Sequence, residues 1–89
     1  MIPRRFAPAV PVAVRCDPRT GLPRRLGWRG RVAAVAAVEA RWRWDEGWWR
    51  GAGEATKREY YRVRARDGLR CVVYRDLGTG RWYLDAIVD

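Results

Sequence analysis

The sequence predicts a small all-β protein, a small antiparallel meander or half-barrel of five to six strands with an extended N-terminal arm. Its 89 residues are the length of one domain, close to the size at which a single core is only just sufficient. Apolar and polar residues alternate with a period of two in several short segments. Turn signals separate these segments, above all DPRTG at 17–21 and Asp67-Gly68. Short strands at this spacing favour a sheet that curls on itself.

The arm is predicted at residues 1–9, and residues 10–89 are expected to form a single small β domain. The segment MIPRRFAPAVP, residues 1–11, contains three prolines and two arginines. Proline lacks a backbone donor and restricts the chain, so this composition favours an extended, basic arm over a packed element.

The first predicted strand is VPVAVRCD at 10–17, which is apolar and rich in β-branched residues. It runs into the turn at 17–21, where proline is second and glycine last. LPRRLGWRG at 22–30 is the returning strand, and Gly27 is a candidate bulge within it.

Residues 31–44, RVAAVAAVEARWRW, predict one long strand. With a period of two, one face is apolar without a break: Val32, Ala34, Ala36, Val38, Ala40, Trp42 and Trp44. The other face carries Arg31, Glu39, Arg41 and Arg43. Trp42 and Trp44 are therefore expected in the core. A helix remains the alternative, because alanine favours helices and valine recurs every three residues.

Residues 45–57 contain three glycines and are expected to form a loop. Trp48 and Trp49 are adjacent in it. Neighbouring residues of an extended chain point to opposite sides, so at least one of these rings is expected to be exposed or to cap an edge.

Residues 58–76 predict a hairpin around Asp67-Gly68, taken as a two-residue turn. That turn pairs Arg66 with Leu69, and it places on one candidate core face Tyr61, Val63, Ala65, Val72 and Tyr74. The other face shows Arg62, Arg64 and Arg66 opposite Leu69, Cys71 and Val73. A further turn at 76–80 leads to the last strand, 81–89.

The net charge is +9, and 18 of the 19 basic residues are arginine. Residues 1–31 contribute +7 of this charge. Arginine suits phosphates, carboxylates and ring faces, so the charge indicates nucleic acid, an anionic surface or an acidic protein as partner. GC-rich coding is the alternative reason for arginine in place of lysine, but it does not account for the positive charge.

Catalysis is not expected, because the chain has no His and no Ser to act as general base or triad nucleophile. Cys16 and Cys71 without histidine do not make a usual zinc site, and phosphate-binding motifs are absent. We therefore expect no enzyme, no cofactor and no metal. Cys71 is expected in the core. With no apolar segment for a signal peptide or a membrane span, the expected location is cytoplasmic, with reduced thiols.

Arginines interleaved with aromatic residues are typical of grooves for single-stranded nucleic acid, where bases stack on rings and arginines neutralise phosphates. The candidate binding residues, for nucleic acid or a protein partner, are Arg41, Arg43, Trp48, Trp49, Arg50, Tyr60, Arg62, Arg64 and Arg66. For the alternating arginines at 62–66, a solvated strand face is the alternative interpretation.

Several ordered motifs cover roughly residues 22–88: Arg41-Trp42-Arg43, Trp48-Trp49, Tyr60-Tyr61-Arg62-Val63, Asp67-Gly68, Tyr74-Arg75-Asp76 and Gly80-Arg81-Trp82-Tyr83-Leu84. In these motifs the sequence resembles a small uncharacterised bacterial domain that occurs alone and at the C-terminus of ImuB-type proteins, which are catalytically inactive relatives of Y-family translesion polymerases. The resemblance implies a setting in DNA damage tolerance, where such tails are thought to serve as protein-docking regions.

Two functions are the leading expectations, well ahead of a structural domain or a small enzyme of unknown type. The first is a non-enzymatic accessory module that binds nucleic acid, single-stranded or without sequence preference, in DNA repair. The second is a protein-docking module that recruits a repair or replication partner, in which arginines meet acidic residues and tryptophans act as anchors.

Overall fold

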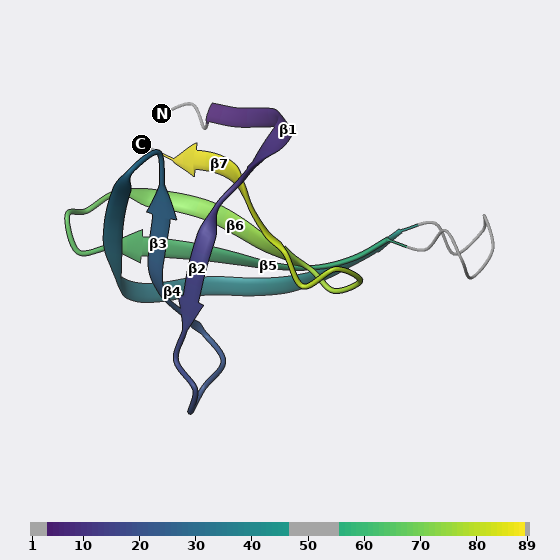
Figure 1. The fold of residues 1–89 in the computed structure, drawn as a ribbon, viewed down its shortest axis with the longest axis horizontal. Helices are drawn as coiled ribbons and strands as arrows, with labels where there is room; N and C mark the ends of the chain where they lie inside the picture. The colour runs from purple at the N-terminus through teal and green to yellow at the C-terminus, as the bar shows by residue number, and fades with distance from the viewer. Residues whose placement is uncertain (1–3, 47–55, 89) are drawn as a thin grey trace.

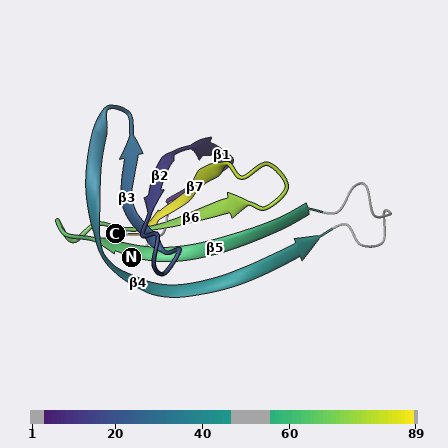
Figure 2. The ribbon, with the colours of Figure 1, turned by 60° about the horizontal axis from the view of Figure 1, so that its bottom comes forward.

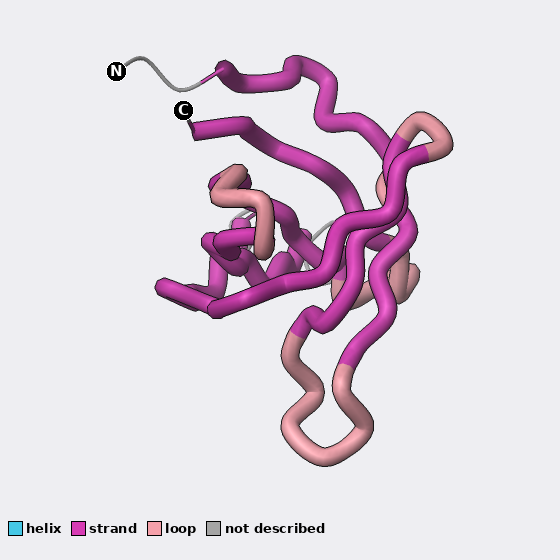
Figure 3. Tube along the Cα trace, turned by 90° about the vertical axis from the view of Figure 1, so that its left-hand side faces the viewer, coloured by secondary structure: helices cyan, strands magenta, loops and turns pink. Residues whose placement is uncertain are grey.

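A computed structural model describes residues 4–46 and 56–88, and every regular element in these two ranges is a β-strand (Figure 3). The sheet order is β1-β7-β6-β5-β4-β3-β2, and all neighbouring strands are antiparallel. This confirms the predicted small antiparallel β domain, a curled half-barrel, with seven strands in the described residues instead of five or six. The strands are β1 (Arg4–Pro11), β2 (Ala13–Cys16), β3 (Pro23–Trp28), β4 (Arg31–Glu46), β5 (Thr56–Ala65), β6 (Arg70–Asp76) and β7 (Trp82–Val88).

The expected N-terminal arm is extended, but the expectation that it does not pack was wrong. Residues 4–11 form β1, which pairs with β7. Proline is tolerated there because β1 is an outermost strand of the sheet and its register is broken between Arg5 and Val10. Phe6 packs against the core, with its ring centroid 5.9 Å from that of Trp28.

The two ends of the sheet meet at Val12, the residue that joins β1 to β2. Its N–H donates to the carbonyl of Trp82 in β7, at 3.1 Å. The first residues of β4 pair with β3 and the remainder with β5, so β4 spans the bend of the sheet. As a result β1, β2 and β3 fold back over one face of the other strands (Figure 2). Beyond this body, the ends of β4 and β5 project as a two-stranded ribbon (Figure 1).

The predicted strand at 31–44 is confirmed as β4, but its predicted apolar face was wrong except at Val38, which packs against the core. The register with β5 shifts between Val35 and Ala37 and again between Val38 and Ala40, so each site holds one extra residue. A one-residue shift exchanges the two faces of a strand. Val35 and Val38 therefore both pack against the core, whereas Val32 is 72% exposed.

Trp42 and Trp44 are not core residues, contrary to the expectation. They are 42% and 49% exposed. Beyond the second bulge Arg41 lies opposite Tyr61, a core residue, while Trp42 lies opposite Tyr60 on the other face. The bulges thus turn both tryptophans away from the interior.

The hairpin of β5 and β6 is confirmed, but its register was wrong by one residue. Gly68 N–H donates to the carbonyl of Ala65 at 3.0 Å, and Ala65 N–H donates to that of Leu69 at 2.7 Å. The loop is thus three residues long, with Gly68 at φ +91°, as in a type I turn followed by a glycine bulge. Val63 consequently pairs with Cys71 rather than with Val72.

This change of register exchanges the predicted faces of β6. Cys71 and Val73 lie in the core, and Val63 and Val73 are fully buried. The expectation that Cys71 is a core residue is confirmed. Tyr74, expected on the core face, lies on the opposite side of the sheet, which we call the outer face.

Candidate nucleic-acid interface

Four aromatic side chains form a continuous row across the outer face, one from each of four neighbouring strands. Trp42 in β4 lies directly opposite Tyr60 in β5, Tyr60 opposite Tyr74 in β6, and Tyr74 opposite Tyr83 in β7. The ring centroids are 5.4, 5.0 and 5.2 Å apart along the row. Such cross-strand aromatic pairs contribute about 0.5–1.5 kcal/mol each beyond their burial. We call these four residues the aromatic row.

The aromatic row is closed in its middle and open at β4. Tyr60 and Tyr74 are 8% and 6% exposed, and burial raises the pKa of the Tyr74 phenol. Trp42 at the β4 end is 42% exposed, and its ring is stacked on that of Tyr60 with an interplanar angle of 4°. The row therefore presents a supported indole ring to solvent, on which a further flat ring can stack.

Arg58 lies over the middle of the aromatic row. Its guanidinium carbon is 4.6 Å from the centroid of the Tyr74 ring, and Nη1 donates to the hydroxyl oxygen of Tyr60 at 3.3 Å. That hydrogen bond raises the pKa of Arg58 further, so the side chain stays charged. Within the described residues, its buried Nε–H has no hydrogen-bond acceptor. The Arg58 guanidinium is thus held over the Tyr74 ring by a cation–π contact and by its hydrogen bond to Tyr60.

Arg41 and Arg43, both candidate binding residues, lie on the other face of β4 from Trp42. The guanidinium of Arg41 is 5.9 Å from the Tyr61 ring centroid, and its Nη2 donates to Glu59 Oε1 at 2.7 Å. Burial, followed by a hydrogen bond to Glu59, raises the pKa of the Tyr61 phenol. Arg43 is exposed and pairs with Glu59 in the backbone register. The structure does not bring these two arginines to the aromatic row.

Three further candidates lie on β5 or at its end. Arg62 and Arg64 follow Tyr60 at two-residue steps, so they share the outer face with it. Both side chains approach Glu39 of β4. Arg66 belongs to the hairpin loop and is exposed, and its backbone N–H donates to the carbonyl of Ala34 at 2.9 Å. Tyr60, Arg62 and Arg64 are thus brought together, and Arg66 is not.

Trp48, Trp49 and Arg50, the remaining candidates, lie outside the described residues. The expectation for the two adjacent tryptophans therefore stays a prediction.

Sequence reasoning did not propose as binding residues several side chains of the outer face: Trp42, Arg58, Arg70, Tyr74 and Tyr83. Tyr74 was placed in the core by the two-residue turn, and with it the match to Tyr60 was lost. A three-residue loop at Asp67-Gly68 would have paired these two tyrosines directly. Tyr83 then follows as the partner of Tyr74 on the next strand.

A separate apolar cleft of about 210 Å³ opens on the core side of the sheet. Two apolar side chains of its lining are exposed, Val32 by 72% and Leu69 by 39%. Trp28, Cys71 and Leu84 also line the cleft. It is lined mainly by apolar residues, whereas the outer face carries rings and arginines.

In residues 4–46 and 56–88, no three His, Cys, Asp or Glu side chains gather as a metal ion would require. In the same part of the chain there is no helix of the length and apolar character that a membrane crossing needs.

Comparison with curated proteins and comparison with solved structures each yielded no match. One family model does match, and it spans residues 3–89, nearly the whole chain. That family is described as a domain of unknown function, DUF6504. The small, curled β domain with its aromatic row is therefore a member of the DUF6504 family.

Proposed function

We propose that this chain is a non-enzymatic accessory module that binds nucleic acid, single-stranded or without sequence preference, through the outer face of its sheet. The observation that supports it best is the position of the aromatic row beside arginines on one face. Trp42 offers an exposed ring at one end, and Arg62 and Arg64 extend from Tyr60 along β5.

Two contributions to the binding free energy support this proposal. A base stacked on an aromatic side chain contributes about 1–3 kcal/mol, with little dependence on its identity. Arginines that neutralise phosphates release counterions, and the net charge of +9 supports this contribution. Neither stacking nor phosphate neutralisation involves hydrogen bonds to the edges of the bases, so the expected binding has no strong sequence preference.

The proposed setting is DNA repair and damage tolerance. It rests on the resemblance of the motifs in this chain, such as Tyr60-Tyr61-Arg62-Val63, to the domain at the C-terminus of ImuB-type proteins. An accessory surface for single strands fits that setting, because stalled synthesis exposes unpaired template.

The test is a titration with a fluorescein-labelled oligothymidylate, followed by anisotropy at several salt concentrations. We expect binding that weakens steeply as salt rises, and a loss of affinity on the order of tenfold for Trp42→Ala. Leu69→Ala is the control, because Leu69 is an exposed apolar residue of the cleft and not of the outer face. Absence of binding by the wild-type protein at low salt would contradict the proposal, whatever the net charge.

A second candidate is a protein-docking module that recruits a repair or replication partner. The apolar cleft favours it, since Val32 and Leu69 are exposed apolar side chains beside a concave surface. In that case Leu69→Asp abolishes binding of one stoichiometric partner, while Trp42→Ala leaves it intact. The opposite pattern of effects would assign the binding to the outer face.

A further inference from the structure

Two arginines face each other across β5 and β6 on the outer face. Arg64 and Arg70 are directly opposite in the register. Like charges in this position destabilise a sheet. Their side chains are 46% and 52% exposed, so water screens the repulsion only in part. An anion between or above the two guanidinium groups would reduce this repulsion.

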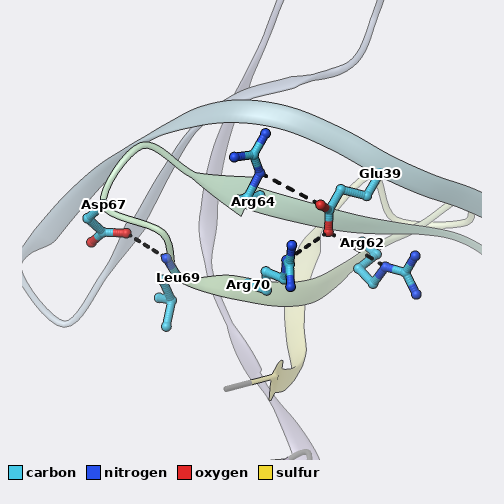
Figure 4. A network of polar contacts seen from close by, with 6 residues as sticks. All are labelled: Glu39, Arg62, Arg64, Asp67, Leu69 and Arg70. Carbon is cyan, nitrogen blue, oxygen red and sulfur yellow. Dashed lines mark hydrogen bonds and ion pairs between the residues drawn. The ribbon is translucent and has the colours of Figure 1, made fainter.

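Glu39 of β4 supplies one such anion (Figure 4). Its Oε1 is 3.2 Å from Nε of Arg70 and 3.9 Å from Nε of Arg62, and its Oε2 is 3.7 Å from Nε of Arg64. Glu39 is the extra residue of the second bulge in β4, between Val38 and Ala40. We call these four residues the Glu39 cluster.

The Glu39 cluster holds three positive charges and one negative charge, so two positive charges are not compensated within it. The carboxylate lies deepest, since the Glu39 side chain is 24% exposed whereas the three arginines are 46–52% exposed. In the described part of the chain, the ion pairs of these arginines all run through Nε. Each guanidinium also carries four N–H groups on its two Nη atoms, which can donate to a further acceptor.

A shallow depression of about 380 Å³ lies at the cluster, lined by Glu39, Arg62, Arg70 and Val88. Along β5, Arg62 is two residues and Arg64 four residues from Tyr60 of the aromatic row. At 3.3–3.4 Å per residue these separations are about 7 and 13 Å. A strand of a few nucleotides therefore reaches from Trp42 and Tyr60 to the depression.

We propose that the Glu39 cluster is a phosphate site in which Arg62, Arg64 and Arg70 bind a phosphodiester of the nucleic-acid backbone and Glu39 acts as an internal counter-ion. This assignment rests on the proposed function, whose face it shares. Glu39 holds the three guanidinium groups together in the free protein, which limits their mutual repulsion. A bound phosphate accepts hydrogen bonds from the Nη groups and neutralises the positive charge that Glu39 does not compensate.

Glu39→Gln tests the counter-ion role. It removes one negative charge and keeps an amide oxygen as acceptor. We expect oligothymidylate to bind on the order of fivefold more tightly at low salt, with a steeper dependence on salt.

Arg64→Ala is expected to weaken binding and to reduce the slope of log K against log salt by about 0.7. Arg70→Ala also relieves the opposed pair, so it stays folded even where Glu39→Gln is destabilised.

Arg19→Ala is the matched control for charge. Arg19 is exposed in the turn between β2 and β3, where its backbone N–H, and not its side chain, bonds to Asp17 Oδ1. The substitution removes one positive charge away from the outer face. An equal effect of Arg19→Ala and Arg64→Ala would overturn the proposed site, since binding would then follow net charge alone.

A titration with inorganic phosphate separates the failure of this site from the failure of the proposed function. We expect the Nε–H signals of Arg62, Arg64 and Arg70 to shift in NMR spectra with phosphate and with oligothymidylate. If oligothymidylate binds but these signals and the variants are unaffected, the site is refuted and the proposed function stands. If only inorganic phosphate shifts them, the assignment to nucleic acid is refuted. A poly-glutamate peptide that shifts them as strongly as oligothymidylate would refute the phosphate specificity.

Discussion

Val32 and Val63 show that position, and not residue type, decides what a side chain contributes to this small domain. Val63 is fully buried between Val38 of β4 and Cys71 of β6, its partners in the register, whereas Val32 is 72% exposed. Burial of apolar area is the main favourable term in folding, so the same methyl groups stabilise the protein at one site and do little at the other.

We expect Val63→Ala to lower the free energy of unfolding by about 2 kcal/mol, because it removes buried methyl groups and leaves a cavity. Val32→Ala makes the same chemical change at an exposed site and is expected to stay within about 0.5 kcal/mol of the wild type. Urea unfolding followed by tryptophan fluorescence measures both. Equal losses in the two variants would show that β4 does not have the bulged register described above.

The thiol of Cys71 makes the stability of the folded protein depend on pH. Burial, followed by the nearby Asp67 carboxylate, raises the pKa of Cys71 from 9.0 to about 11. The folded state therefore retains the thiol proton between pH 9 and 11, where the unfolded state loses it. Stability from this group is fully present below pH 9 and is lost as the pH rises to 11.

We accordingly expect the urea midpoint to fall between pH 9 and 11, and to fall less in Cys71→Ala. The burial of Tyr61 and Tyr74 raises their pKa values too, so the variant still loses part of its stability at alkaline pH.

At neutral pH, Ellman's reagent is expected to react with Cys16, which is half-buried, before Cys71. Faster reaction of Cys71 in the folded protein would contradict its core position.

At the scale of elements, local irregularities decide which side chains face the core. Alternation in the sequence identifies β4 and the β5–β6 hairpin correctly. It does not show the two bulges in β4 or the third residue of the hairpin loop, because each is one residue among several compatible choices. The bulges bring Val35 into the core beside Val38, and the loop brings Cys71 and Val73 there. Packing of these apolar residues is what selects the register.

Gly68 is the residue on which the hairpin loop depends. Its φ of +91° lies in a region that side chains with a Cβ rarely adopt, so Gly68→Ala is expected to cost about 1 kcal/mol. Gly27→Ala is the control, since its new Cβ would meet Ala13 Cβ at an ordinary contact distance of 3.5 Å. Thermal unfolding distinguishes the two variants. A neutral effect at Gly68 would be inconsistent with the three-residue loop.

At the scale of the whole molecule, closure of the sheet depends on the N-terminal segment. β1 pairs with β7, and Val12, which joins β1 to β2, donates a hydrogen bond to the carbonyl of Trp82 in β7. Phe6, from the segment that the sequence presents as an arm, packs with Trp28 of β3. In a chain of 89 residues a single core is small, so the burial of one aromatic side chain where the sheet closes is a large share of the stability.

Phe6→Ala is expected to lower the free energy of unfolding by about 2 kcal/mol, roughly half the cost at a fully buried site. Arg5→Ala on the same strand removes an ion pair with Asp85 at 3.7 Å whose arginine is 75% exposed, and it is expected to cost less than about 0.5 kcal/mol. Chemical denaturation measures both. If Phe6→Ala were as mild as Arg5→Ala, β1 would be the unpacked arm that its prolines suggest.

The sequence by itself determined the antiparallel β architecture, the main strands, the hairpin and the core position of Cys71, because these depend on alternation, turn residues and apolar character along the chain. It also drew attention to Tyr60, Arg62 and Arg64. Only the tertiary structure decided that Trp42 faces outward, that Tyr60, Tyr74 and Tyr83 align with it, and that Glu39 meets three arginines. The physical reason is register: a shift of one residue changes every cross-strand neighbour, and its choice depends on packing between strands far apart in the chain.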